Sequence, residues 1–245
     1  ADVLFQMFFT IGRIMFAYLL WKVIFNGRES ISGFTFDSML SYYIFNSFLT
    51  QLDLSRGISE EIHNRIRGGS FSKYIVLPIS TEGYFLAMEA GVVLFYLVFD
   101  LIAAFAWVLI FGIRLQVTGE VQIILCALLM TLLGLLFMVQ LNYYLGLLTL
   151  KYRGIGTFLM IKNNLAALIT GSIVPLALLP EGVVQLMRLL PFYYVTYLPS
   201  MLMTGRCREE ALTGLAVLAV WCLVMQAAIY LTWEKYSRKY DGVGI

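Results

Sequence analysis

Charged residues are scarce in this sequence, and their scarcity excludes a water-soluble globule. Asp, Glu, Lys and Arg make up 13% of the 245 residues, against about 25% in an ordinary soluble domain. The hydrophobic share is 60%, and the mean hydropathy is +0.84. So few polar side chains cannot cover a soluble surface, so the chain is predicted to lie in a lipid bilayer. The net charge of +2 gives no sign of a nucleic-acid partner.

Motifs for catalysis and metal binding are also missing. The sequence contains no G-x-x-x-x-G-K-[ST] phosphate loop, no H-E-x-x-H and no G-x-S-x-G, and its one histidine, His63, has no second ligand beside it. The cysteines Cys126, Cys207 and Cys222 have no metal-ligand spacing. We therefore expect no catalytic residue, no metal site and no cofactor bound by this chain.

Long apolar segments are what the sequence does have. A helix that crosses about 30 Å of hydrocarbon needs roughly 20 apolar residues. Six segments meet this requirement, and they predict an all-α integral membrane protein with a single transmembrane domain over residues 1–245. The predicted spans are about 4–25, 36–54, 84–111, 121–150, 157–179 and 210–233.

The distribution of Lys and Arg predicts which ends of the spans face the cytoplasm. Six spans put both termini on one side, and cytoplasmic loops carry the excess of basic residues. One set of segments contains nine basic residues, namely Arg56, Arg65, Arg67, Lys73, Lys151, Arg153, Lys235, Arg238 and Lys239. The opposite set contains five, namely Arg28, Arg114, Arg188, Arg206 and Arg208. Both termini and a loop over residues 55–83 are therefore predicted to be cytoplasmic, with residues 180–207 outside.

The external segment 180–207 is interrupted by prolines at positions 180, 191 and 199. Prolines break helices, so its pieces are too short to span a membrane. We expect two short helices or a re-entrant dip that packs as a lid on the outer mouth of the bundle. The predicted lid residues are Pro191, Phe192, Tyr193, Tyr194 and Tyr197. The alternative is that the three tyrosines form an aromatic belt at headgroup level.

The cytoplasmic loop contains one short amphipathic helix. Its core is predicted from about Ser59 to Arg67, with Ser59 as the cap, Glu60 and Glu61 in the first turn, and the pair Gly68 and Gly69 as the left-handed stop. Apolar side chains recur every four residues, at Ile58, Ile62 and Ile66. We expect this stripe to need a partner surface, because the loop is too small to bury it. The alternative is that the stripe dips into the lipid interface.

Three stretches of the sequence resemble the six-span branch of the type-two permease family of ABC transporters, which includes drug-resistance permeases. They are ISEEIHNRIRGGSFSKYIVLPIS in the cytoplasmic loop, LPFYYVTYLPSMLMTG after IVPLALLPEGV, and the ending KYDGVGI. The PFYY piece is the most specific of them. The family usually begins with an interfacial elbow helix, which this chain lacks. The chain also starts at Ala1 rather than Met, so we expect a further segment before it.

The resemblance implies a function and a set of partners. The chain would be the permease of an ATP-driven exporter in the plasma membrane of a bacterium, moving an amphipathic or hydrophobic compound by alternating access. It would work with two ABC ATPase subunits, which bind ATP and Mg, and with a second permease chain, identical or homologous. The loop helix would be the coupling helix that enters a groove of the ATPase. The coupling residues would be Ile58, Ser59, Glu60, Glu61, Ile62, Arg65, Ile66, Gly68 and Gly69.

Charged residues inside the predicted spans need partners, because lipid does not solvate them. Glu89 and Asp100 lie in the third span, and Arg13 and Lys22 lie at matching depths in the first. We expect pairing of Arg13 with Glu89 or of Lys22 with Asp100, at most one of the two. Alternatively, Asp100 lines the substrate path.

Amides in the spans are candidates for the cavity lining or for permease dimer packing. The resemblance places the second and fifth spans near the dimer axis, which favours Asn46, Asn163 and Asn164. Two other classes of function stay open at this point. One is a proton-coupled secondary transporter that uses Glu89 and Asp100, and the other is a membrane scaffold without transport activity.

Overall fold

The computed structural model describes residues 2–53, 55–75, 78, 80–112, 114–171 and 176–237, and these residues form helices and no strand. The all-α class is therefore confirmed for this part of the chain. The α-helices are α1 (Asp2–Phe25), α2 (Phe36–Leu52), α3 (Arg56–Arg67), α4 (Ser72–Ile75), α5 (Thr81–Phe111), α6 (Val121–Leu147), α7 (Gly156–Ile169), α8 (Glu181–Met187), α9 (Leu198–Met203) and α10 (Ala211–Tyr236). Short 3-10 turns are η1 (Leu148–Leu150), η2 (Leu176–Leu178) and η4 (Arg208–Glu210), and η3 (Tyr193–Tyr197) is a π-helix.

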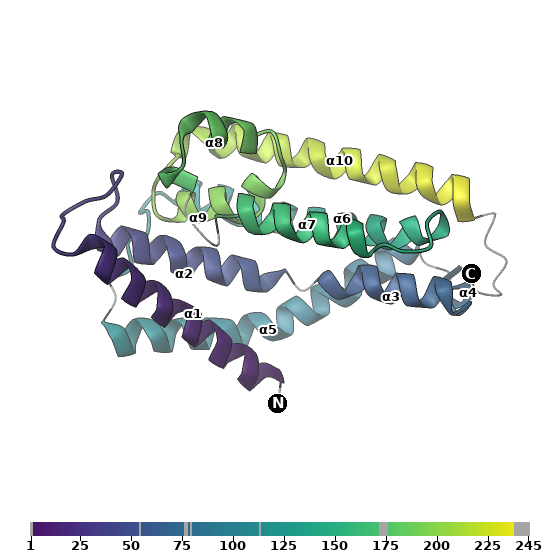
Figure 1. Cartoon of the computed structure of the whole chain (residues 1–245), viewed down its shortest axis with the longest axis horizontal. Coiled ribbons are helices and arrows are strands. Elements are labelled where there is room, and N and C mark those ends of the chain that lie inside the picture. The colour runs from purple at the N-terminus through teal and green to yellow at the C-terminus, as the bar shows by residue number, and fades with distance from the viewer. Residues whose placement is uncertain are drawn as a thin grey trace.

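The long helices run along one axis of the molecule (Figure 1). α6 and α10 pack against each other along their length, and α2 is followed almost in line by α3. α1 lies obliquely and packs on α2 and α5. The short helices α8 and α9 gather at one end, which we call the α9 end, whereas α3 and α4 lie at the other, the α3 end.

Three helices among the described residues are long and apolar enough to cross a membrane, namely Thr81–Phe99, Val121–Leu150 and Arg208–Tyr236. They coincide with the predicted third, fourth and sixth spans. A shorter apolar helix covers Met15–Phe25, within the predicted first span. α2 falls in the predicted second span and has 17 residues. The chain is thus a membrane protein, and the full set of six spans stays a prediction.

The helix expected over 157–179 is shorter in the structure. α7 has 14 residues and ends at Ile169, which is about 21 Å of helix at 1.5 Å per residue. Gly171 has a φ of +68°, and a Cβ there would collide with the Tyr42 hydroxyl. A left-handed glycine stops a helix, so hydropathy alone gave too long an element. Residues 172–175 lie outside the described part.

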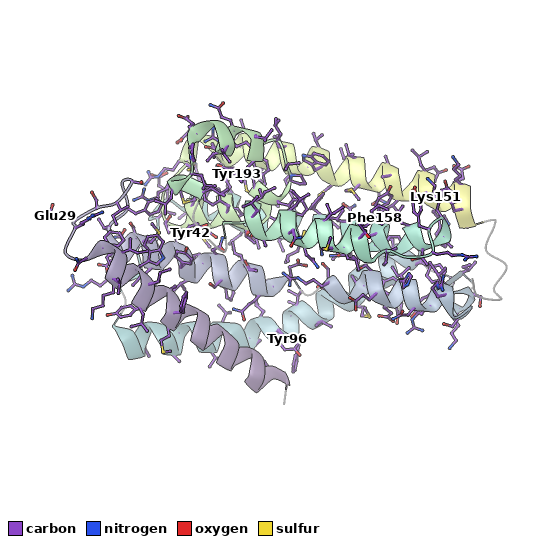
Figure 2. All side chains as sticks on the ribbon, viewed as in Figure 1. Glu29, Tyr42, Tyr96, Lys151, Phe158 and Tyr193 are labelled. Carbon is purple, nitrogen blue, oxygen red and sulfur yellow. The ribbon has the colours of Figure 1, made fainter. Side chains whose placement is uncertain are left out.

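Two apolar clusters hold the described residues together. The larger one lies towards the α9 end and includes Tyr42, Phe137, Tyr193 and Leu198. The smaller one surrounds α3 and joins it to α6 and α10 through residues such as Tyr143 and Ile229. Figure 2 shows Tyr42 and Tyr193 towards the α9 end and Lys151 at the α3 end. α6 contributes to both clusters and so connects the two ends.

Candidate functional site

α3 begins and ends close to the predicted positions. Ser55 is the residue before its first turn, so the cap is four residues earlier than the predicted Ser59, whose hydroxyl instead donates to the Arg56 carbonyl at 3.2 Å. Gly69 has a φ of +71°, and its N–H donates to the Ile66 carbonyl at 3.2 Å. The left-handed glycine stop is therefore present, with Gly68 as the helix C-cap.

The isoleucine stripe of α3 is buried against this chain's own helices. Ile58 is 2% exposed, and Ile62 and Ile66 are 0% exposed. They pack with Tyr143 and Leu147 of α6 and with Ile229 of α10. The expectation that the stripe needs a partner surface is therefore wrong for this conformation, and so is the alternative that it dips into lipid.

The length of α6 explains how the chain covers the stripe by itself. α6 has 27 residues, or about 40 Å of helix, whereas the hydrocarbon core is about 30 Å thick. Its last turns can thus extend beyond the bilayer and offer a surface to α3. Gly146 makes the contact close, because a Cβ at this position would lie 2.8 Å from the Ile62 Cβ.

Burial of the stripe leaves the polar side of α3 facing outward. Arg56, Glu60, Asn64 and Arg67 are exposed, and we call these four residues the polar face of α3. On the flank of the helix, Glu61 and Arg65 form a half-buried ion pair at 2.7 Å. The part of α3 available to another protein is therefore charged rather than apolar.

α3 is also tied to the segment that follows α6. His63 Nδ1 lies 2.9 Å from the Thr149 hydroxyl, and an Arg67 guanidinium N–H donates to the Arg153 carbonyl at 3.3 Å. Burial lowers the pKa of His63, and the Arg67 cation lowers it further. The imidazole is therefore neutral at pH 7, and its contact with Thr149 is an ordinary neutral hydrogen bond. His63 belongs to the anchoring of α3 rather than to a metal site.

A buried polar chain starts at the beginning of α3 and ends in α7. The Ser55 hydroxyl donates to the Asp53 carboxylate. The Asn142 side-chain amide donates to the Ser55 hydroxyl at 2.8 Å, and the Lys162 ammonium donates to the Asn142 side-chain carbonyl at 2.9 Å. Asn142 is fully buried and Lys162 is 6% exposed. We call these four residues the polar chain, and it joins α2, α3, α6 and α7.

The polar chain borders a cavity of about 330 Å³. Its charged end is formed by Asp53, Arg56 and Lys162, with Asn163 and Asn164 beside them. The rest of the lining combines apolar side chains, Met138, Ala166, Ala167 and Val195, with the hydroxyl-bearing Thr50, Thr170 and Thr196. The cavity therefore has a charged part and a second part in which apolar side chains alternate with threonines.

Comparison with known protein families gives one match. The family model described as ABC-2 family transporter protein matches residues 11–244. The chain belongs to the ABC-2 transporter family. It is thus a membrane permease of an ABC transporter, and membership of this family implies an ABC ATPase as its partner. Neither the search of curated proteins nor the search of solved structures gave a match.

Of the amides expected in this ABC-2 permease's cavity, two line it and one does not. Asn163 and Asn164 are exposed and lie in the lining. Asn46 is 1% exposed, and its side-chain amide donates to the Thr170 carbonyl at 2.8 Å and to the Tyr42 hydroxyl at 3.3 Å. Asn46 thus holds the end of α7 against α2.

Two of the four residues in the proposed charge pairs have side chains that the structure does not describe. The side chains of Arg13 and Asp100 lie outside the described residues, so neither pairing is tested. Glu89 is buried, with 7% of its surface exposed. Lys22 is exposed, and its ammonium lies 5.8 Å from the centre of the Tyr18 ring.

The predicted lid residues of the permease are buried at the α9 end. Phe192, Tyr193, Tyr194 and Tyr197 are each 6% exposed or less, and Pro191 is buried as well. The Tyr193 hydroxyl donates to the Glu210 carboxylate at 3.0 Å. A belt of tyrosines at the headgroup level does not describe these side chains, because they face the interior of the chain.

The polar chain is the feature that sequence reasoning missed. Ser55, Asn142 and Lys162 are up to 107 residues apart in the sequence, and no spacing rule connects them. One signal was available, since Lys162 and Asn142 are polar residues inside apolar segments, where a partner is required. That signal indicates that each residue has a partner and does not identify it.

Proposed function

We propose that this permease works in an ATP-driven exporter for an amphipathic or hydrophobic compound, with α3 as its coupling helix. The working unit contains two ATPase subunits, which hold ATP and Mg, and a second permease chain, identical or homologous. The α3 end and both termini face the cytoplasm of a bacterial plasma membrane. Transport proceeds by alternating access of the cavity beside α7.

The observation that carries this proposal is the two-sided character of α3. One side is fixed to α6 by three buried isoleucines, and the other presents Arg56, Glu60, Asn64 and Arg67. A helix that is rigidly held and yet offers a charged surface suits docking to a second protein. Movement of that protein then moves α3 as a body, because a packed interface does not deform continuously.

A path from α3 to the cavity supports the proposed coupling. Ile62 presses on α6 at Gly146, and Ser55 at the start of α3 leads through Asn142 to Lys162 in the cavity wall. A displacement of α3 would therefore act on α6 and α7 together. ATP-driven closure of the ATPase would shift the population between inward and outward states through these contacts.

The balance of free positive charge supports the proposed orientation. At the α9 end, Arg188 pairs with Glu210 at 2.8 Å and Arg208 pairs with Glu120, whereas Arg28, Arg114 and Arg206 form no ion pair among the described residues. At the α3 end, six exposed basic residues form no ion pair within the described part of the chain, namely Arg56, Arg67, Lys73, Lys151, Arg153 and Lys235. Basic residues that stay uncompensated favour the cytoplasmic side.

Charge reversal on the polar face tests the docking. The permease is purified in mild detergent with its ATPase, as the wild type and as Arg67→Glu, and ATP hydrolysis in the eluate is measured. We expect Arg67→Glu to lose most of the copurified hydrolysis, because a rim charge at an interface is reversed. Arg28→Glu is the matched control, since Arg28 is exposed in the loop after α1 at the other end. Equal hydrolysis in all three preparations would contradict docking on α3.

A further inference from the structure

We propose that the cavity beside α7 binds an amphipathic acid, with its carboxylate or phosphate group at Lys162 and Arg56 and its apolar chain along α7. The inference deepens the proposed export function, since it names the chemical class of the substrate. The binding itself is a property of the permease alone.

The sign of the ligand's charge follows from the partners of Lys162. Lys162 is buried, with 6% of its surface exposed, and its ammonium donates to the side-chain oxygen of Asn142, which is neutral.

 Lys162 forms no ion pair among the described residues. The nearby carboxylate of Asp53 attracts it but accepts its hydrogen bonds from Ser55. A buried cation held by a neutral amide is stabilised by a further anion.

A second cation at the same end strengthens the preference for an anion. Arg56 lines the cavity beside Lys162 and is exposed. Against these two positive charges stands the single negative charge of Asp53. The charged end of the cavity is thus net positive, and Asn163 and Asn164 add amide donors there. The Lys162 ammonium, the Arg56 guanidinium and the two asparagine amides are all donors that a carboxylate or phosphate group accepts from.

The rest of the cavity suits an apolar chain. From Lys162 to Thr170 the wall extends eight residues, or about 12 Å. Ala166 and Ala167 leave room because their side chains are small, and Met138 and Val195 add apolar surface to the lining. The volume of about 330 Å³ is at the lower end of the roughly 300–1,000 Å³ of small-molecule sites. A ligand with one acidic head and one medium-length chain matches this shape.

The test compares three probes that share one chain and differ in the charge of the head. Decanoate, decylammonium and decanol are titrated against the purified permease, without ATPase, in nanodiscs of zwitterionic lipid, and binding is followed by calorimetry. We expect saturable binding of decanoate and at least tenfold weaker binding of the other two. Equal binding of all three, or a preference for decylammonium, would overturn the proposal.

Variants locate the binding in the cavity. Lys162→Gln keeps a donor for Asn142 and removes the charge, and we expect at least a tenfold loss of decanoate affinity. Ala166→Phe fills the apolar part of the cavity, leaves Lys162 in place and should lower the affinity for decanoate by a similar factor. With two independent variants, a folding defect in one of them still leaves the other as a test. Lys22→Gln on α1 is the matched control and should bind decanoate as the wild type does. Unchanged affinity in both cavity variants would refute the site.

Two further measurements separate the source of the acid and the role of the site. If the natural ligand is an anionic lipid, nanodiscs that contain phosphatidylglycerol should weaken decanoate binding, because the lipid competes for the cavity. If the natural ligand is an acid from solution, they should leave decanoate binding unchanged. The comparison identifies the source of the acid once the site has been located by the variants. These titrations contain no ATPase, so they do not depend on the coupling role of α3. Decanoate can bind in the cavity even if Arg67→Glu leaves ATPase copurification intact, and Arg67→Glu can abolish copurification even if decanoate does not bind. Failure of the site and failure of the coupling proposal are therefore distinguishable.

Discussion

α6 is approached closely by two different segments, and the two contacts differ in what they leave exposed. Near the C-terminal end of α6, Gly146 admits Ile62 of α3, and at the middle of α6, Gly134 admits the backbone of Val195 in η3, which a Cβ would approach to 3.2 Å. Residues 191–202, around η3 and α9, are buried throughout, whereas α3 keeps its polar face exposed. The α9 end is therefore completed by this chain, and the α3 end retains a surface for another protein.

The charges at the two ends differ in the same way. Arg188, Arg206 and Arg208 at the α9 end bind Glu210, the Gly33 carbonyl and Glu120, respectively. Arg206 also lies 3.9 Å from the centre of the Phe34 ring. The exposed cations Arg56 and Arg67 at the α3 end have no carboxylate partner among the described residues. Three of the five arginines at the α9 end are thus bound within this chain and Arg28 and Arg114 are exposed; the larger number of free cations at the α3 end supports the docking that we propose there.

The largest expected effect comes from filling the close contacts on α6. Gly146→Val should lower the free energy of unfolding by about 3 kcal/mol, because overpacking displaces Ile62 and with it α3. The second change Ile62→Ala should restore part of the loss, since side-chain atoms of Ile62 make the contact. Unfolding in detergent, followed by tryptophan fluorescence, measures both.

Gly134→Val is the matched change at the other close contact, in the middle of α6. Its nearest contacts are the Cα and carbonyl oxygen of Val195, so Val195→Ala should restore little. If Gly146→Val unfolded like the wild type, the close packing of α3 on α6 would be refuted.

A smaller effect is expected from breaking the polar chain. Asn142→Ala removes the acceptor of the Lys162 ammonium and should cost about 2 kcal/mol of unfolding free energy, as for hydrogen bonds to charged groups. Asn46→Ala removes a buried amide whose partners, Thr170 and Tyr42, are neutral, and should cost about 1 kcal/mol. Thermal unfolding of the two variants side by side gives the comparison. A larger loss for Asn46→Ala would argue against a charged Lys162.

The smallest effect is expected from the ion pairs on the surface of each end. Glu210→Gln weakens bonds to both Arg188 and Tyr193 and should cost about 1 kcal/mol. Glu61→Gln breaks the pair with Arg65 one helical turn away and weakens only a long bond of 3.5 Å from the Tyr74 hydroxyl, so it should cost about 0.4 kcal/mol. Both values come from unfolding at low salt, and both losses should shrink in high salt because of screening. Losses that are independent of salt would show that the two glutamates act through packing instead.

Hydropathy predicted where most of the long helices lie, because each needs a long apolar run whatever it packs against. It failed for α7, where the residue that ends the helix matters more than the apolar run. Gly69 and Gly171 both have left-handed backbone conformations, with φ of +71° and +68°. Gly69 was recognisable as a stop because it follows a polar helix, whereas Gly171 lies inside the apolar segment predicted as a span over 157–179.

The partners of the functional residues could not be predicted in the same way. The spacing of Ile58, Ile62 and Ile66 predicts a buried stripe, but it does not say whether another protein, lipid or α6 covers it. The covering surface depends on how far α6 extends and on the missing side chain at Gly146. Likewise, Lys162 needed a polar partner, and only the packing of α6 against α7 identifies Asn142.

The most direct test of the coupling role of α3 is a cross-link from its polar face in the assembled transporter. A photoreactive amino acid is placed at position 64 in native membranes, and the adduct is identified by mass spectrometry and by its ATP-hydrolysing activity. The account predicts an adduct with the ATPase from position 64 and none from position 28. An adduct with lipid alone from position 64, in a preparation that hydrolyses ATP, would contradict it.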